Sequence, residues 1–145
     1  MPPLHPFFVH FPIALLTLGF IADVVAVTRR PSIAGTLGWW NLLAGTVGLI
    51  VTVASGLISK ANVGALSGPA AGTLSTHEQL AFACLVGFLM LVFWRIASKT
   101  AIPPRSPRVY LCLAGVCLIL LWCTAWFGGE LVYLFGIGVL PSPAP

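Results

Sequence analysis

Four long hydrophobic stretches dominate the chain, and short segments with polar residues, glycine or proline separate them. A helix needs about 20 apolar residues to cross the ~30 Å hydrocarbon core of a bilayer. Each stretch meets this length, so we expect helices at about residues 6–27, 33–58, 76–98 and 109–127. The pattern predicts an all-α integral membrane protein, a four-helix bundle that forms one domain over residues 1–145.

Glycine, proline and polar residues set the expected helix ends. Residues 61–74 are rich in Gly, Ala and Ser and carry no charge, which indicates a loop. Ser75-Thr76-His77-Glu78 has the spacing of a capping box, so the third helix is expected to begin near Thr76, with the histidine in its first turn. Gly128-Gly129 is expected to end or bend the fourth helix, which leaves about 130–140 as a short interfacial segment. No repeat of fixed period stands out.

Composition supports the membrane assignment and excludes several classes of protein. Hydrophobic residues make up 59% of the chain and charged residues 7%, whereas charged residues reach about 25% in soluble domains. There is no basic run of the kind that binds nucleic acid. No nucleophile arrangement and no phosphate-binding glycine loop is visible, so hydrolytic and nucleotide chemistry have no support. Because the N-terminus lacks a basic region, we expect no cleaved signal peptide.

The basic residues predict the topology. Six of the seven lie in or beside the two loops on one side of the membrane: Arg29, Arg30, Arg95, Lys99, Arg105 and Arg108. Lys60 is the one basic residue expected on the other side. Because cytoplasmic loops are enriched in Lys and Arg, we expect a bacterial inner-membrane protein with both termini on the periplasmic side. Four ionisable groups then share the outer leaflet: His5, His10, His77 and Glu130.

The three histidines indicate a functional site, because ionisable groups are costly in lipid and rarely gather at one depth without a role. On a regular helix, His5 and His10 differ in direction by about 140°. They could share one small ion only if the helix began irregularly, as Pro6 and Pro12 would allow. The simpler pair is His10 from the first helix and His77 from the third.

Two histidines that face each other across a helix bundle can serve as axial ligands of haem b. We therefore predict His10 and His77 as the axial pair. His5 and Glu130 are expected to orient an imidazole or to act as alternative ligands, and Glu78 could also orient one. A stripe of small residues on the second helix would make room for a flat cofactor or for a neighbouring helix: Ala44, Gly48, Thr52 and Gly56.

Two other interpretations stay open. One is a non-haem site for Cu, Zn or Fe, built from the histidines and Glu130. The other is a structural subunit of a larger membrane complex, whose histidines only satisfy polar groups.

Elsewhere, Asp23 is expected to pair with Arg29 or Arg95. The cysteines are expected to be small buried residues, with a disulfide such as Cys84–Cys123 as the alternative: Cys84, Cys112, Cys117 and Cys123.

Two motifs resemble the bacterial membrane family catalogued as domain of unknown function 2231. They are the opening HPFFVHFPIALL (residues 5–16) and the closing GGELVY (residues 128–133), accompanied by Asp23, His77, Gly136 and Val139. The resemblance covers nearly the whole chain and implies a compact four-helix membrane domain with no assigned activity. Some family members are joined to Rieske iron–sulfur or cytochrome c modules, which implies a role in electron transfer by analogy.

Pattern and resemblance together predict an electron carrier rather than a stand-alone enzyme. It would hold haem b near the outer leaflet, with His5, His10, His77 and Glu130 as the residues to test. We expect it to exchange electrons with quinone or an outer-face carrier. Its expected surroundings are the lipid bilayer and other subunits of a respiratory or photosynthetic complex.

Overall fold

A computed structural model describes residues 5–29 and 32–138, and every regular element in these residues is a helix. The elements are α1 (His5–Phe8), α2 (His10–Arg29), α3 (Ser32–Ala61), α4 (Gly68–Ala97) and α5 (Pro107–Tyr133). α1 and α2 together form one span, and α3, α4 and α5 form one each, all apolar and long enough to cross a membrane. The predicted all-α four-helix membrane fold is confirmed.

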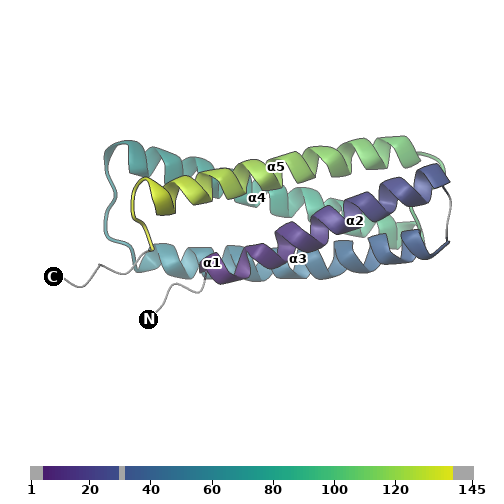
Figure 1. The fold of residues 1–145 in the computed structure, drawn as a ribbon, viewed down its shortest axis with the longest axis horizontal. Helices are drawn as coiled ribbons and strands as arrows, with labels where there is room; N and C mark the ends of the chain where they lie inside the picture. Colours follow the sequence, from purple (N-terminus) through teal and green to yellow (C-terminus); the bar gives the residue numbers. More distant parts are fainter. Residues whose placement is uncertain (1–4, 30–31, 139–145) are drawn as a thin grey trace.

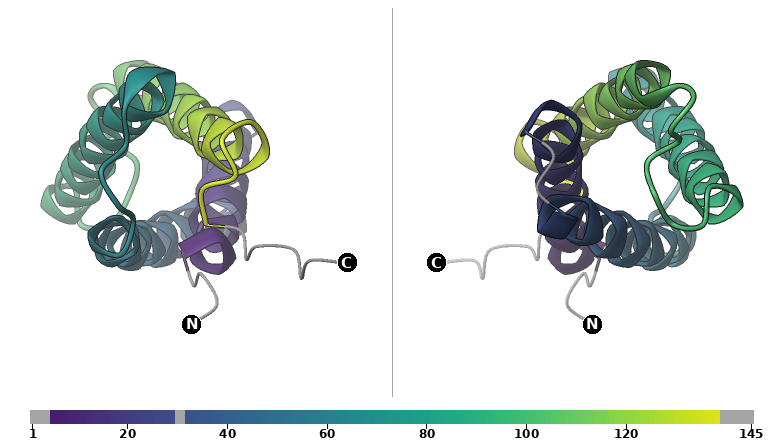
Figure 2. Two further views of the ribbon diagram at one scale, coloured as in Figure 1. Left: turned by 90° about the vertical axis from the view of Figure 1, so that its left-hand side faces the viewer. Right: turned by 90° about the vertical axis from the view of Figure 1, so that its right-hand side faces the viewer.

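The four spans run alternately up and down and form a closed ring when seen end-on (Figures 1 and 2). α2 packs chiefly against α3, and α4 packs chiefly against α5. α1, the loop between α3 and α4, and the last turn of α5 lie at one end, which we call the His5 end. The connection between α4 and α5 lies at the other, which we call the Arg95 end. Short connections between neighbouring spans are what produce this up-down order.

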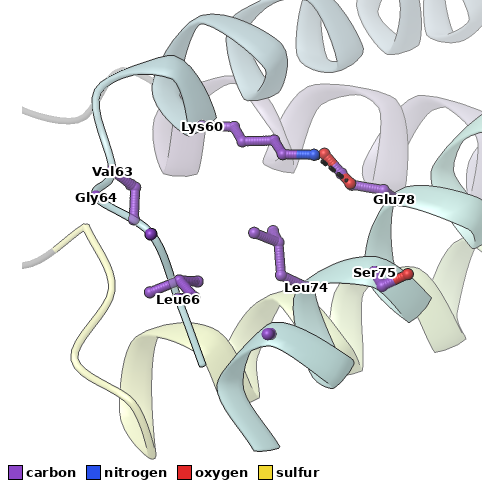
Figure 3. A pocket seen from close by; sticks show the side chains of 9 residues that line it. Lys60, Val63, Gly64, Leu66, Leu74, Ser75 and Glu78 are labelled. Carbon is purple, nitrogen blue, oxygen red and sulfur yellow. Dashed lines mark hydrogen bonds and ion pairs between the residues drawn. The ribbon is translucent and has the colours of Figure 1, made fainter. Parts of the chain in front are cut away.

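α4 begins at Gly68, about two turns earlier than residue 76, so the predicted capping box is wrong. Ser67 is the N-cap residue and Pro69 stands in the first turn, where its missing N–H is not needed. Ser75 and Glu78 therefore lie inside the helix. Glu78 bonds across to Lys60 of α3 instead, with 2.7 Å between Oε2 and Nζ, beside a cavity of about 400 Å³ (Figure 3).

α5 continues through Gly128-Gly129 and ends at Tyr133, so the predicted stop after residue 127 is also wrong. The helix ends six residues before Val139, and residues 134–138 form turns in which Gly136 and Gly138 have positive φ. Residues 139 and 140 of the predicted interfacial segment lie outside the described part of the chain. Neither glycine of the pair breaks α5, because each takes ordinary helical geometry.

The first span begins irregularly, as Pro6 and Pro12 allow. Val9 interrupts the helix between α1 and α2, and the backbone bond from Ile13 N–H to its carbonyl is long, at 3.5 Å. Pro12 has no N–H to donate to the carbonyl of Phe8, which explains the weak hydrogen bonding here. This break leaves α1 free to take its own direction against α3.

The core lies inside the ring of helices and contains both small and large apolar side chains. It includes Leu16, Leu42, Leu49, Cys84, Phe88, Leu91, Tyr110, Cys117 and Leu121. Large apolar side chains also cover the outside, where Met90 and Phe93 are each 66% exposed. In water such a surface would be an aggregation hazard, whereas in a bilayer it is the surface that contacts lipid.

All four cysteines are free thiols, and only two match the predicted burial. Cys84 and Cys117 are buried between α4 and α5, while Cys112 and Cys123 are exposed on α5.

A membrane-permeant maleimide is therefore expected to modify two thiols per chain in mild detergent and four after unfolding in SDS, as counted by intact mass. The Cys112→Ser/Cys123→Ser variant is the control and is expected to stay unmodified until it unfolds. Early modification of Cys84 or Cys117 would contradict the packing of α4 on α5.

Candidate functional site

Two imidazole rings meet inside the His5 end of the bundle. His5 of α1 and His77 of α4 have ring centroids 6.2 Å apart, with ring planes at 85° to each other. His77 stands nine residues after Gly68, which is about 14 Å along α4. It therefore lies well inside the helix, whereas the sequence placed it in the first turn. Both rings are only partly accessible.

Each ring is held through its Nδ1 atom by a backbone carbonyl on a neighbouring helix. His77 Nδ1 lies 2.9 Å from the carbonyl oxygen of Thr124 on α5. His5 Nδ1 lies 3.0 Å from the carbonyl oxygen of Thr52 on α3 and 3.1 Å from Ser55 Oγ. A carbonyl only accepts, and the Ser55 hydroxyl donates its proton to that same carbonyl. These contacts assign the proton to Nδ1 in both rings, so each neutral imidazole keeps a lone pair on Nε2.

A glycine next to each ring allows this close approach. A Cβ atom at Gly56 would stand 3.0 Å from His5 Cε1, and one at Gly128 would stand 3.1 Å from His77 Cε1. Real Cβ contacts are rarely this short, so a larger residue would push the ring away from its carbonyl. Gly56 belongs to the predicted stripe of small residues, but an imidazole occupies the space beside it. Gly128, read from the sequence as a helix stop, is instead a contact surface.

His10 is not part of this pair, and the predicted juxtaposition of His10 with His77 is wrong. Its side chain is exposed at the first residue of α2, and it has no hydrogen bond or ring contact with any described residue. The two histidines of the first span point in different directions, as their spacing required. His5 is the one that faces the bundle, because α1 packs on α3.

Neither glutamate of the described residues 5–29 and 32–138 is hydrogen-bonded to an imidazole ring. Glu130 accepts a hydrogen bond from Trp126 Nε1 on its own helix, at 3.1 Å. Glu78 is paired with Lys60. Across this same part of the chain, no three His, Cys, Asp or Glu side chains are close enough to hold a metal ion together. The site therefore offers two protein nitrogen donors, and backbone carbonyls do the orienting that we expected from carboxylates.

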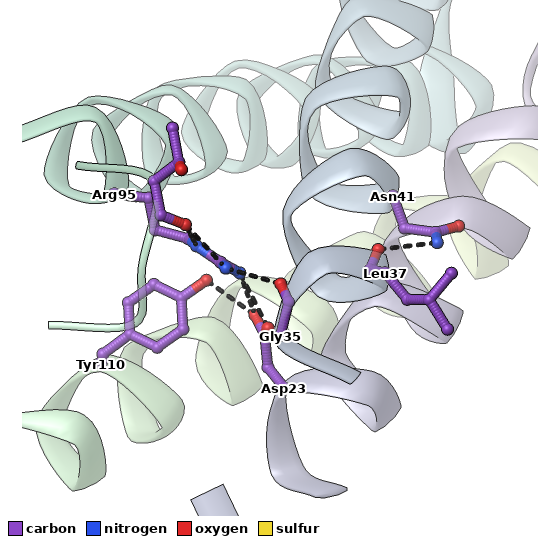
Figure 4. A network of polar contacts seen from close by, with 7 residues as sticks. Asp23, Gly35, Leu37, Asn41, Arg95 and Tyr110 are labelled. Carbon is purple, nitrogen blue, oxygen red and sulfur yellow. Dashed lines mark hydrogen bonds and ion pairs between the residues drawn. The ribbon is translucent and has the colours of Figure 1, made fainter. Parts of the chain in front are cut away.

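A second polar cluster is buried at the Arg95 end (Figure 4). Arg95 Nη1 donates to both carboxylate oxygens of Asp23, at 2.7 and 2.9 Å, and Tyr110 donates to the same carboxylate at 2.9 Å. The remaining guanidinium nitrogens donate to the carbonyls of Gly35 and Thr100. Of the two expected partners of Asp23, Arg29 and Arg95, the structure pairs it with Arg95. Every group of the pair has a partner, so this cluster holds α2, α3, α4 and α5 together.

Sequence reasoning missed the partners that complete both clusters. Thr52 and Thr124 act through main-chain carbonyls, which any residue type would supply, so their side chains gave no indication. In the sequence, nothing distinguished Tyr110 from the other residues of an apolar helix. The glycines four residues after each carbonyl, Gly56 and Gly128, are visible in the sequence, but their partners across the bundle are not.

Comparisons with known proteins identify the family of the chain. The model of the family described as a predicted membrane protein, domain of unknown function 2231, matches residues 1–141. No curated protein and no solved structure matches the chain. The match takes in the four spans and both imidazoles of the His5–His77 pair. The chain therefore belongs to the membrane protein family catalogued as domain of unknown function 2231.

Proposed function

We propose that this protein carries electrons through a haem b held by His5 and His77 as axial ligands. The supporting observation is the pair of neutral imidazoles from two different helices, each with Nδ1 bound to a carbonyl and a lone pair left on Nε2. Hydrogen bonding at the other ring nitrogen fixes the tautomer and strengthens electron donation to a metal. When bound, haem b supplies one-electron chemistry; the protein residues hold it and set its surroundings.

The number of donors favours haem over a bare metal ion. Zinc sites take three or four protein ligands, whereas the described residues provide two nitrogens here. Haem brings four nitrogens of its own and needs only axial ligands from the protein. The ring centroids lie 6.2 Å apart, so the imidazoles of His5 and His77 would both be within reach of one bound group. The absence of a Cβ at Gly56 and Gly128 makes room for the two imidazole rings themselves.

The proposal extends to location and partners. The excess of Lys and Arg beyond the Arg95 end supports an inner-membrane topology with the His5 end toward the periplasm. Haem at that depth would exchange electrons with quinone or with a Rieske or cytochrome c partner on the outer face. The protein would then be a carrier within a respiratory or photosynthetic assembly rather than a stand-alone enzyme.

A reduced-minus-oxidised absorption spectrum tests the proposal. Protein purified after haem-replete expression is expected to show b-type bands, which His5→Ala and His77→Ala each abolish. His10→Ala is the matched control, because this histidine is exposed and lies outside the His5–His77 pair, and it is expected to keep the bands. A colourless wild-type protein would overturn haem binding, and bands that persist in His5→Ala or His77→Ala would overturn the ligand assignment.

A structural role is the second candidate function, favoured by the same hydrogen bonds. His5 ties α1 to α3 and His77 ties α4 to α5, so both rings cross-link helices without any cofactor. In this case the wild-type protein would be colourless, and His5→Ala and His77→Ala would each lower its melting temperature in detergent. Metal analysis of the same preparation detects Cu, Zn or Fe if the imidazoles bind an ion instead.

A further inference from the structure

The two imidazoles have the same surroundings at the same sequence spacing. His5 reaches the carbonyl of a threonine 47 residues later, and His77 does the same. In both cases the glycine beside the ring comes four residues after that threonine, as the pairs Thr52 with Gly56 and Thr124 with Gly128 show. Each member of the second set stands 72 positions after its counterpart in the first (77 − 5, 124 − 52 and 128 − 56).

The same offset of 72 relates the buried faces of the helices. The four buried positions of α2 correspond to buried positions of α4: Pro12 to Cys84, Leu16 to Phe88, Gly19 to Leu91 and Asp23 to Arg95. Six buried positions of α3 correspond to buried positions of α5: Gly38 to Tyr110, Leu42 to Ala114, Gly45 to Cys117, Thr46 to Leu118, Leu49 to Leu121 and Thr52 to Thr124. The residue types mostly differ, so the correspondence is one of burial and position.

These correspondences describe two helical hairpins related by a pseudo-two-fold axis. The first hairpin comprises α1, α2 and α3, and the second comprises α4 and α5. α2 and α4 run in the same direction along the bundle, so the axis runs along the bundle too (Figures 1 and 2). Parallel repeats in membrane proteins have this arrangement, with the axis along the membrane normal.

Two pairs of equivalent residues touch each other across this axis. A residue in contact with its own symmetry mate must lie at the axis, as in an isologous interface. His5 contacts His77 at one end, and Asp23 contacts Arg95 at the other. At the Arg95 end the two halves carry opposite charges, because two equal buried charges would repel. At the His5 end the two halves have kept the same side chain, the same tautomer, the same carbonyl partner and the same glycine.

We propose that the chain is an internally duplicated hairpin, and that its His5–His77 site on the pseudo-two-fold axis takes a cofactor through two equivalent imidazoles, one from each half. The identity of the cofactor rests on the function proposed above, but the equivalence of the two half-sites does not. Neither imidazole would be the dominant ligand, and neither half would form the site alone.

The first experiment measures equivalence without any cofactor. In the full chain, Gly56→Ala and Gly128→Ala are expected to lower the melting temperature by similar amounts, because each methyl group meets the ring of its own half. Adding His5→Ala is expected to relieve the effect of Gly56→Ala but not that of Gly128→Ala, and adding His77→Ala the reverse. If Gly56→Ala or Gly128→Ala prevents the protein from accumulating, rescue by removal of the histidine in the same half also shows the expected coupling. Unequal couplings, or relief by the histidine of the other half, would overturn the equivalence.

The second experiment measures equivalence at the cofactor. With haem bound, His5→Gly and His77→Gly are each expected to lose the bis-imidazole spectrum and to regain it with added imidazole over the same concentration range. If only one of the two glycine variants changes its spectrum, haem binding is asymmetric. This result would overturn the equivalence of the two imidazoles but not the proposal that the protein binds haem. A colourless wild-type protein would overturn haem binding, while the first experiment still decides whether the two half-sites are equivalent.

Discussion

Replacement of Arg95 by methionine is expected to lower the free energy of unfolding by about 3–5 kcal/mol, because it leaves a buried carboxylate without its cation. Asp23 is 2% exposed and Arg95 1% exposed, so the pair is buried in the native protein. The same substitution also frees the carbonyls of Gly35 and Thr100, which the guanidinium serves at present. Reversible unfolding of the purified protein in mixed micelles, followed by circular dichroism, measures the change.

An exposed ion pair on the same protein provides the control. Lys60 and Glu78 have the same 2.7 Å separation, but the lysine side chain is 50% exposed and the glutamate 25%. Lys60→Met is therefore expected to cost no more than about 1 kcal/mol. The Asp23→Asn/Arg95→Met variant is expected to recover part of the loss of Arg95→Met, because it removes the unpaired charge. Equal losses at Arg95 and Lys60 would show that burial does not control the strength of the Asp23–Arg95 pair.

Replacement of Gly19 by alanine is expected to lower the free energy of unfolding by about 1–3 kcal/mol through overpacking. A Cβ atom there would stand 3.1 Å from Asn41 Cβ and 3.3 Å from the backbone nitrogen of Leu42, so it meets α3 at its main chain. Backbone cannot rotate away as a flexible side chain can, and α2 would have to move off α3. Unfolding in micelles, measured as for Arg95→Met, reports the change.

Gly72→Ala is the matched control for Gly19→Ala. Both glycines are helical, but nothing lies within 4 Å of a Cβ atom at Gly72. Alanine is favoured over glycine in a helix by up to about 1 kcal/mol, so this variant is expected to be as stable as the wild type or slightly more so. A loss of stability at Gly72 as large as that at Gly19 would contradict the close approach of α2 and α3.

The identity of the spans could be read from the chain, but not all of their ends. α4 starts at Gly68 because Ser67 takes the N-cap position and Pro69 stands in the first turn. The later Ser75–Glu78 pattern does not cap a helix, and Glu78 pairs with Lys60 instead. α5 passes through Gly128-Gly129 because the ring of His77 packs against Gly128, where a side chain would not fit without displacing the ring. At Gly128 a tertiary contact overrode the low helix propensity of glycine, whereas at the start of α4 one local signal prevailed over another.

The repeat also escaped detection in the sequence, for a physical reason. Lipid-facing positions accept almost any apolar residue, and buried positions of the two halves hold different volumes, as Gly38 and Tyr110 do. What the halves share is which positions are buried and where the imidazoles bond. These are properties of the packed bundle, so they emerge only when both hairpins are in place.

The sequence by itself determined that the protein lies in a membrane, how many spans it has and which few ionisable residues are candidates for a site. This is possible because the free-energy cost of polar groups in lipid acts on each segment separately. The tertiary structure alone decided which residues meet. It placed His5 rather than His10 beside His77, selected Arg95 over Arg29 for Asp23, and added Tyr110. Partner choice depends on how helices rotate and cross, and on backbone carbonyls and glycine surfaces that each helix presents only to its neighbours.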